Sequence, residues 1–251
     1  MAGRELIARY RGARRCSGKV VLEGFHALKH ALRFGAVVEH AASPDPDRIE
    51  ELTRSLAPDL QSRIRPLLTA VPAQLFRELA PHPPPTPLLA IARRPETGLA
   101  HFAAAEAAPA VLLDRPRHLG NLGATVRVAA AAQARGVLVF GGADPWHPTA
   151  VRTAAGLHFA LPVLTLESIE HLQDPIFALD PQGAALDPAR IPRNAVLAFG
   201  SERQGLSPEI RTRAVERVAL PMRPGVSSLN LATAVAAALY ALSFHAGAGC
   251  R

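Results

Sequence analysis

From residue 110 onward, short apolar runs alternate with segments of helical periodicity. The apolar runs predict strands over residues 111–113, 137–140, 161–166, 195–199 and 218–220. Helices are predicted up to residue 134, over 149–155, from Pro208 onward and over 229–244. This alternation is typical of a mostly parallel sheet flanked by helices, in which ligands bind beyond the carboxyl ends of strands. We therefore predict an α/β fold whose functional residues lie in the loops after strands.

The first hundred residues have a different pattern. A helix-like stretch over residues 23–34 is followed by short extended pieces such as 36–39 and 88–92. A break rich in polar residues, 93–98, then precedes the regular alternation. We predict a small α/β domain over residues 1–98 and a larger domain over 99–251.

The charge of the chain indicates a polyanionic partner. The net charge is +7 with a pI near 10.6, and almost all of the cations are arginine, a bias that a GC-rich genome also produces. The first 35 residues hold eight cations against two acids, which predicts a local basic surface; the alternative is a solvated, frayed terminus. Its candidate RNA-binding residues are Arg9, Arg11, Arg14, Arg15 and Lys19.

Several classes of protein are excluded by composition. No apolar run approaches the roughly 20 residues of a membrane span, and the Arg-rich amino terminus lacks the apolar core of a secretory signal. We therefore expect a cytoplasmic protein. The two cysteines, Cys16 and Cys250, have no metal-ligand spacing around them, so we expect neither a disulfide framework nor a metal site.

The first segment with chemical potential, residues 114–127, runs from a strand end through a glycine-bearing turn into a helix. Such a helix start attracts anions through its unpaired amides. Asn121 is expected just outside the helical turn, and Arg127 on a face where Gly123 leaves room for its guanidinium; the alternative is an arginine that is merely exposed. Three spaced glycines are lacking, which argues against a nucleotide-dependent oxidoreductase.

Two further segments repeat the design of strand, polar loop and helix. In residues 197–208, glycines allow close approach of a ligand, and Ser207 is expected to cap the helix that Pro208 begins. Capping does not account for Glu202 in that loop. In residues 220–231, Ser227 or Ser228 is the expected cap, and Asn230 is not needed for capping.

Together these segments resemble the SpoU (TrmH) family of knotted RNA methyltransferases. Asn121, Gly123 and Arg127 resemble its first motif. The sequences Gly-Ser-Glu from Gly200 and Gly-Leu-Ser from Gly205 resemble the second, and Pro-Met at 221–222 with Ser-Leu-Asn at 228–230 resemble the third. The likeness covers about residues 110–244. Residues 15–36 are similar to the small ribosomal-protein-like RNA-binding domain that often precedes this catalytic domain.

The resemblance implies a carboxyl-terminal trefoil knot, which binds S-adenosylmethionine, and a homodimer with its active site at the subunit interface. The implied activity is methylation of a ribose 2′-hydroxyl, with ribosomal RNA favoured over tRNA, a guanosine as the target, and antibiotic resistance a compatible role. The implied donor-binding residues are Gly200, Ser201, Gly205, Leu220, Met222 and Leu229. The implied catalytic residues are Arg127, Asn121, Glu202, Ser228 and Asn230.

Two questions stay open at this point. Arg127 is either a base that takes the hydroxyl proton or a clamp that fixes the target phosphate and lowers the pKa of the hydroxyl. The alternative to an enzyme is a non-catalytic RNA-binding protein on the same scaffold that acts in ribosome assembly; the presence of both Arg127 and Asn230 argues against it.

Overall fold

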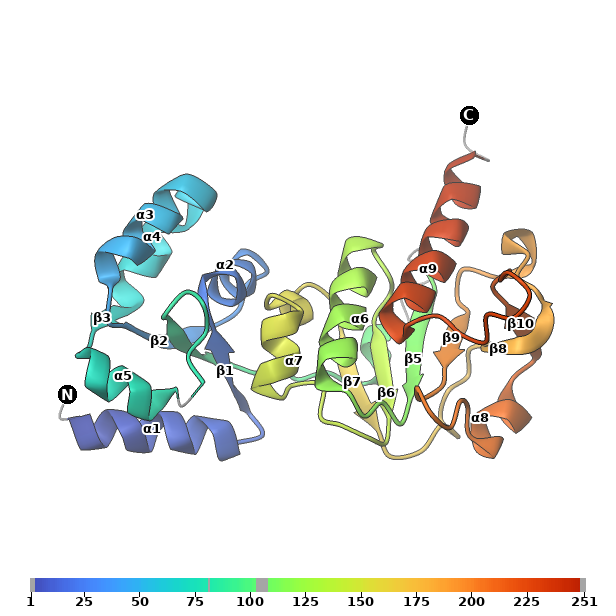
Figure 1. Ribbon diagram of the computed structural model, residues 1–251, viewed down its shortest axis with the longest axis horizontal. Coiled ribbons are helices and arrows are strands. Elements are labelled where there is room, and N and C mark those ends of the chain that lie inside the picture. Colours follow the sequence, from blue (N-terminus) through green and yellow to red (C-terminus); the bar gives the residue numbers. More distant parts are fainter. Residues whose placement is uncertain (1–2, 81, 103–107, 249–251) are drawn as a thin grey trace. The chain divides into compact units, whose positions relative to one another are not determined.

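The computed structural model describes residues 3–80, 82–102 and 108–248 (Figure 1). The chain divides into two compact units, Met1–Glu96 with Trp146–Ala160, and Thr97–Pro145 with Leu161–Arg251. Residues 146–160, which the sequence analysis assigned to the second domain, therefore pack with the first. Helix α7 (Pro148–Thr153) lies against β1 (Lys19–Glu23), where Nη1 of Arg152 donates to Oε2 of Glu23 at 2.9 Å.

The first unit is a four-stranded sheet with helices. Strand β4 runs antiparallel between β1 and β2, and β3 pairs parallel to β2, giving the order β1-β4-β2-β3. Besides β1 and α7, its elements are α1 (Gly3–Arg15), α2 (Phe25–Arg33), β2 (Val38–Ser43), α3 (Pro46–Leu56), η1 (Pro58–Leu60), α4 (Gln61–Ile64), η2 (Arg65–Leu67), β3 (Leu68–Ala70), α5 (Ala73–Leu79), β4 (Leu89–Arg93) and η4 (Leu157–Phe159).

The sequence located only some of the elements of this unit. The predicted helix and extended pieces correspond to α2, β2 and β4, but the helix begins at Phe25, because Glu23 ends β1 and Gly24 turns the chain at φ +89°. Helices α1, α3, α4 and α5 and strands β1 and β3 were not predicted. The apolar face of α1 is short, consisting of Leu6, Tyr10 and Ala13 among many arginines, so its periodicity is weak.

A buried polar contact links α1 to the sheet. Burial raises the pKa of the Tyr10 hydroxyl, which stays protonated and donates to the carbonyl of Leu89 at 3.0 Å. Nδ1 of His40 lies 3.1 Å from the same hydroxyl oxygen. Because the single hydroxyl hydrogen is used by Leu89, the imidazole is the donor in the second bond. His40 is thus held with its proton on Nδ1.

The second unit contains a six-stranded, fully parallel sheet of order β10-β8-β9-β5-β6-β7. Helices α6 and α9 lie side by side and pack together (Figure 1). The elements are η3 (Leu99–Phe102), β5 (Ala110–Asp114), α6 (Leu119–Ala131), β6 (Val137–Phe140), β7 (Val163–Leu166), β8 (Ile176–Ala185), η5 (Pro188–Arg190), β9 (Val196–Phe199), α8 (Pro208–Arg213), β10 (Glu216–Ala219) and α9 (Leu231–Ala248).

The predicted parallel α/β arrangement is confirmed, with two local corrections. All five predicted strands of this unit are present within one or two residues of their expected bounds, whereas β8, a strand between β9 and β10, was not singled out. Helix α6 begins at Leu119, so Asn121 lies inside its first turn and not outside it. Because β5 and β9 are buried along their whole length, their sequences are apolar throughout, apart from Asp114 at the end of β5, and this makes central strands recognisable.

Other expectations concern membranes, metals and thiols. Among the described residues, no helix combines the length and apolarity needed to cross a bilayer. Within the same residues, no group of three or more His, Cys, Asp or Glu side chains is arranged to hold a metal ion. Cys16 is an exposed free thiol, and Cys250 lies outside the described residues.

We expect the melting temperature to fall as the pH is lowered from 7 towards 5. Burial lowers the pKa of His40, and also that of His30, whose Nδ1 donates to the carbonyl of Ala155. The unfolded chain therefore takes up protons from about pH 6.5 downward that the folded chain does not bind, and stability is lost over that window. Calorimetry across this range tests it: His40→Asn should flatten the dependence, and a wild-type melting temperature that stays constant would contradict it.

Candidate functional site

The middle of β8, the loops at the carboxyl ends of β9 and β10, and the start of α9 enclose a cavity of about 420 Å³. This is the edge of a parallel sheet where ligands are expected, and the volume lies in the usual range for small-molecule sites. The lining residues are mostly apolar: Leu179, Pro181, Phe199, Gly200, Gly205, Val218, Leu220, Met222, Leu229, Leu231 and Ala234, with Asp180, Ser201, Glu202, Ser228 and Asn230 as the polar members.

The turn after β9 forms one wall and depends on glycine. Ser201 and Gly205 exchange both backbone hydrogen bonds, at 3.1 and 2.9 Å, and Gly205 has φ +63°. A Cβ at Gly200 would lie 2.1 Å from the carbonyl carbon of Gly205, which real structures do not tolerate. The tight turn is therefore possible only because Gly200 has no side chain, and it exposes backbone atoms to the cavity.

Three polar side chains from distant segments form a hydrogen-bonded chain. Oδ1 of Asn230 accepts from the backbone N–H of Ala232 and of Thr233, at 3.0 and 3.4 Å, and Nδ2 of Asn230 donates to Oδ1 of Asn121 at 3.1 Å. Nδ2 of Asn121 then donates to Oε1 of Glu202 at 2.8 Å. Asn230 thus caps α9, which corrects the expectation that Ser227 or Ser228 does so.

A buried carboxylate anchors the second loop to the first. Asp114, 1% exposed at the end of β5, accepts a short hydrogen bond from the backbone N–H of Ser207 and pairs with Arg115. The Oγ of Ser207 in turn accepts from the N–H of Ile210, so Ser207 caps α8 as expected. The loop that carries Glu202 is therefore tied at its far end to β5, the strand before Asn121.

The cavity also has residues on β8 that the sequence analysis missed. Asp180 is 6% exposed; its Oδ1 accepts from the N–H of Gln182, and its Oδ2 lies 3.5 Å from Nη2 of Arg211 and 3.8 Å from Nη1 of Arg217. Leu179 lies beside it in the cavity wall. No motif marks this strand, and only its place beside β9 reveals the contribution.

Nine of the eleven residues predicted for catalysis and donor binding line the cavity: Gly200, Ser201, Glu202, Gly205, Leu220, Met222, Ser228, Leu229 and Asn230. Asn121 joins them through its hydrogen bonds to Glu202 and Asn230. Arg127 is exposed on α6 and is not among the residues that line the cavity of its own chain.

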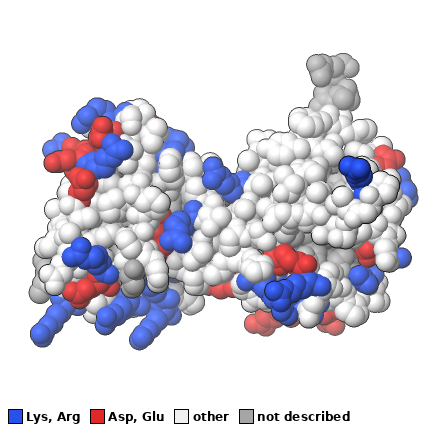
Figure 2. Space-filling view, viewed as in Figure 1, with Lys and Arg blue, Asp and Glu red and all other residues white. Residues whose placement is uncertain are grey.

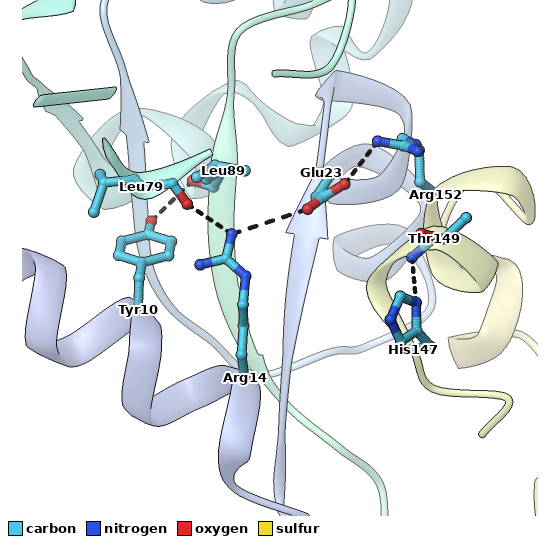
Figure 3. A network of polar contacts seen from close by, with 8 residues as sticks. All are labelled: Tyr10, Arg14, Glu23, Leu79, Leu89, His147, Thr149 and Arg152. Atoms are coloured by element: carbon cyan, nitrogen blue, oxygen red, sulfur yellow. Dashed lines mark hydrogen bonds and ion pairs between the residues drawn. The ribbon is translucent and has the colours of Figure 1, made fainter. Parts of the chain in front are cut away.

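The five predicted RNA-binding residues divide into two groups. Nη2 of Arg14 donates to the carbonyl of Leu79 at 2.8 Å and lies 3.9 Å from Glu23 (Figure 3). Arg9 donates to the carbonyl of Glu39, and Nζ of Lys19 lies 2.7 Å from Oε2 of the same residue. The ion pairs with Lys19 and Arg93 hold the pKa of the Glu39 carboxyl below its usual range, chiefly through the hydrogen bond from Lys19. The other two, Arg11 and Arg15, are exposed.

The profile of the SpoU rRNA Methylase family matches residues 108–240, which include the whole cavity wall. The chain belongs to this family. It is 29% identical to the 23S rRNA (uridine(2479)-2′-O)-methyltransferase of Streptomyces viridochromogenes, over 92% of this chain and 84% of that protein. It is 27% identical to the 23S rRNA (guanosine(2553)-2′-O)-methyltransferase of Bacillus subtilis, over 88% and 87%.

A solved structure agrees with this assignment. The crystal structure of the SpoU methyltransferase AviRb from Streptomyces viridochromogenes in complex with AdoMet has a TM-score of 0.79 and 25% identity, and the match covers 95% of this chain and 97% of that one. An uncharacterized tRNA/rRNA methyltransferase of Synechocystis is 35% identical, and there this chain spans about half of the relative, 51% of its length.

We expect Gly200→Ala to abolish binding of S-adenosylmethionine and to lower the free energy of unfolding by about 1–3 kcal/mol, because the added methyl group overpacks the turn. Isothermal titration with S-adenosylmethionine and a denaturant titration measure both effects. Gly120→Ala in α6 is the matched control, since no atom lies within 4 Å of its added Cβ. Equal donor affinity in the two variants would contradict the assignment of this turn.

Proposed function

We propose that this protein transfers a methyl group from S-adenosylmethionine to a ribose 2′-hydroxyl of ribosomal RNA. The observation that carries the proposal is the cavity at the carboxyl edge of the sheet with the Asn121–Glu202–Asn230 chain beside it, in a SpoU rRNA methylase. When bound, S-adenosylmethionine supplies a methyl group activated by a sulfonium.

The residues present fit this donor. Leu220, Met222 and Leu229 supply apolar surface suited to an adenine ring, and the bare backbone at Gly200 allows close approach of a flat ligand. Ser201 and Gly205 complete the turn. The trefoil knot that the family resemblance implies is part of this proposal. So is a cytoplasmic location, where ribosomal RNA is assembled into ribosomes.

The protein's own residues have to orient the ribose and help its hydroxyl to lose a proton. Glu202 and Asn121 hold one another at 2.8 Å and present fixed polar atoms to the ribose, and Ser228 lies at the cavity wall beside Asn230. Guanidinium groups in general stay charged in proteins, which favours the phosphate clamp over the base as the role of Arg127. The ribose oxygen then bonds to the methyl carbon, the carbon–sulfur bond breaks and the hydroxyl proton is released to solvent.

A homodimer accounts for the position of Arg127 outside the cavity of its own chain. Helix α9 packs on α6 and exposes apolar side chains, with Phe244 74% and Tyr240 38% exposed. Burial of such aromatic rings between two subunits is favourable, and a twofold interface presents the same surface from both chains. An interface through α9 and α6 would bring Arg127 of one subunit to the cavity of the other.

The target base stays a prediction. The two relatives named above act on uridine and on guanosine, so methylation of the ribose is what they share. Guanosine is the base that we propose here, and ribosomal RNA is favoured over tRNA because of the separate basic first unit.

Methyl transfer from radiolabelled S-adenosylmethionine to unmodified total RNA tests the reaction. We expect label on a 2′-oxygen, recognised by resistance of the adjacent bond to alkali, and a decrease of about 100-fold or more in Arg127→Ala, in which a positioned charge is lost. Arg193→Ala, which removes another exposed arginine of the same unit, should keep full activity. Absence of transfer to rRNA, tRNA and ribosomal particles by a folded protein would favour the non-catalytic RNA-binding alternative.

Mixing two inactive variants tests the shared site. If each site combines Asn230 of one subunit with Arg127 of the other, a mixed dimer of Arg127→Ala and Asn230→Ala chains has one intact site. With random exchange of subunits, activity should recover to about a quarter of the wild-type value, since half of the dimers are mixed. No recovery, with exchange verified by mass spectrometry, would place both residues in one chain.

A further inference from the structure

Helix α1 has two faces of different character. Leu6, Tyr10 and Ala13 are buried against the first unit, where α1 packs on β1 and α5. The opposite face is exposed and carries Arg4, Ala8, Arg11 and Arg15. Positions 4, 8, 11 and 15 repeat at intervals of three and four residues, so they form a single stripe along the helix.

The arginines of the stripe differ from the other cations of the amino-terminal segment in their lack of hydrogen-bond or ion-pair partners among the described residues. Arg9, Arg14 and Lys19 are committed to carbonyls and carboxylates of the same unit, as Figure 3 shows for Arg14. In the part of the chain that the structure describes, Arg4, Arg11 and Arg15 form no hydrogen bond or ion pair. Figure 2 shows Lys and Arg atoms projecting from the edge of the unit where α1 lies.

The spacing and the surroundings of the stripe suit an extended polyanion. From Arg4 to Arg15 the helix rises about 16 Å at 1.5 Å per residue, which exceeds the reach of a single small anion. Ala8 lies on the stripe between the guanidinium groups and Gly12 lies beside it, and no atom lies within 4 Å of where a Cβ of Gly12 would be. Glu5, exposed on the same side as Gly12, is the one acidic residue of the helix. A bulky backbone can therefore approach all three guanidinium groups at once.

We propose that the outer face of α1, formed by Arg4, Arg11 and Arg15, binds the phosphate backbone of the substrate RNA. This inference rests on the proposed function and deepens it, because it assigns the docking of the substrate to one helix face. Guanidinium groups match phosphate geometry and read no base, so the contact contributes affinity and orientation without sequence preference. An anionic membrane is the less suitable partner, since the apolar face of α1 is already buried and is not available for insertion.

The test is the salt dependence of RNA binding by the full chain. The variant Arg4→Ala/Arg11→Ala/Arg15→Ala keeps the helix, because alanine has the highest helix propensity. The matched control is Arg48→Ala/Arg54→Ala/Arg65→Ala, which removes the same charge from α3 and η2 of the same unit. The affinity for transcribed ribosomal RNA is measured over a range of KCl concentrations, and the affinity for S-adenosylmethionine by titration.

We expect the α1 variant to bind RNA at least about 10-fold more weakly at moderate salt and to lose about two to three units of the slope of log affinity against log salt. Its donor affinity should equal that of the wild type, and the control should keep nearly all of the slope. Equal slopes in the α1 variant and the control would overturn the inference. Binding to vesicles of anionic lipid that exceeds binding to RNA, and is lost in the α1 variant, would also overturn it.

The outcome is separable from that of the proposed function. If the wild type methylates RNA while both variants bind RNA alike, the proposed function stands and the α1 surface is wrong. If the wild type transfers no methyl group to any RNA but the α1 variant alone loses the salt-dependent binding, the surface stands and the enzymatic function is wrong.

Discussion

The side chain of Asn230 forms the interaction on which the site depends. Its oxygen accepts hydrogen bonds from the first turn of α9. Because the amide is planar, its nitrogen then has to point away from the helix. The orientation passes to Asn121 and from there to Glu202, across sequence separations of 109 and 81 residues. The start of α9 and the alignment of the polar groups beside the cavity are therefore coupled. Loss of the Asn230 side chain would remove both the cap of α9 and the hydrogen bond that orients Asn121 towards Glu202.

The parallel sheet supplies the second condition. In a sheet whose strands all run the same way, the loops after β9 and β10 meet at one edge beside the middle of β8, and this brings three separate segments around a single cavity. Because Gly200 has no side chain, the loop after β9 can fold back so that the backbone of Gly205 packs against Gly200, closer than any Cβ would allow. Asp114 then fixes the end of that loop to the neighbouring strand. The rigid sheet and the absence of a side chain act together to leave backbone exposed to a ligand.

In the first unit the positive charge has two separate uses. Arg14 and Lys19 satisfy carbonyls and carboxylates within the fold, and their removal would leave buried or half-buried acceptors without donors. The arginines on the outer face of α1 have no such task in the described residues. Net charge alone does not distinguish these uses, because the same guanidinium is a structural donor or a free cation according to what lies within about 3 Å of it.

The sequence by itself determined the sheet of the second unit and most of its site. Buried parallel strands are mostly apolar, and the first two of the three glycine-bearing loops follow such strands, so these strands and loops could be located from local pattern. Local pattern also identified Ser207 as a helix cap, since the cap and the following Pro208 are adjacent in sequence.

Only the tertiary structure decided which groups meet. Asn230 was not expected to cap α9, the contribution of β8 through Asp180 carried no local mark, and the packing of α7 on β1 joins residues 129 positions apart. Arg127 matches its motif and yet lies outside the cavity of its chain. The physical reason is common to all of these: helix starts, strand neighbours and ion pairs across the fold are set by three-dimensional packing, whose partners leave no periodic trace in the sequence around either residue.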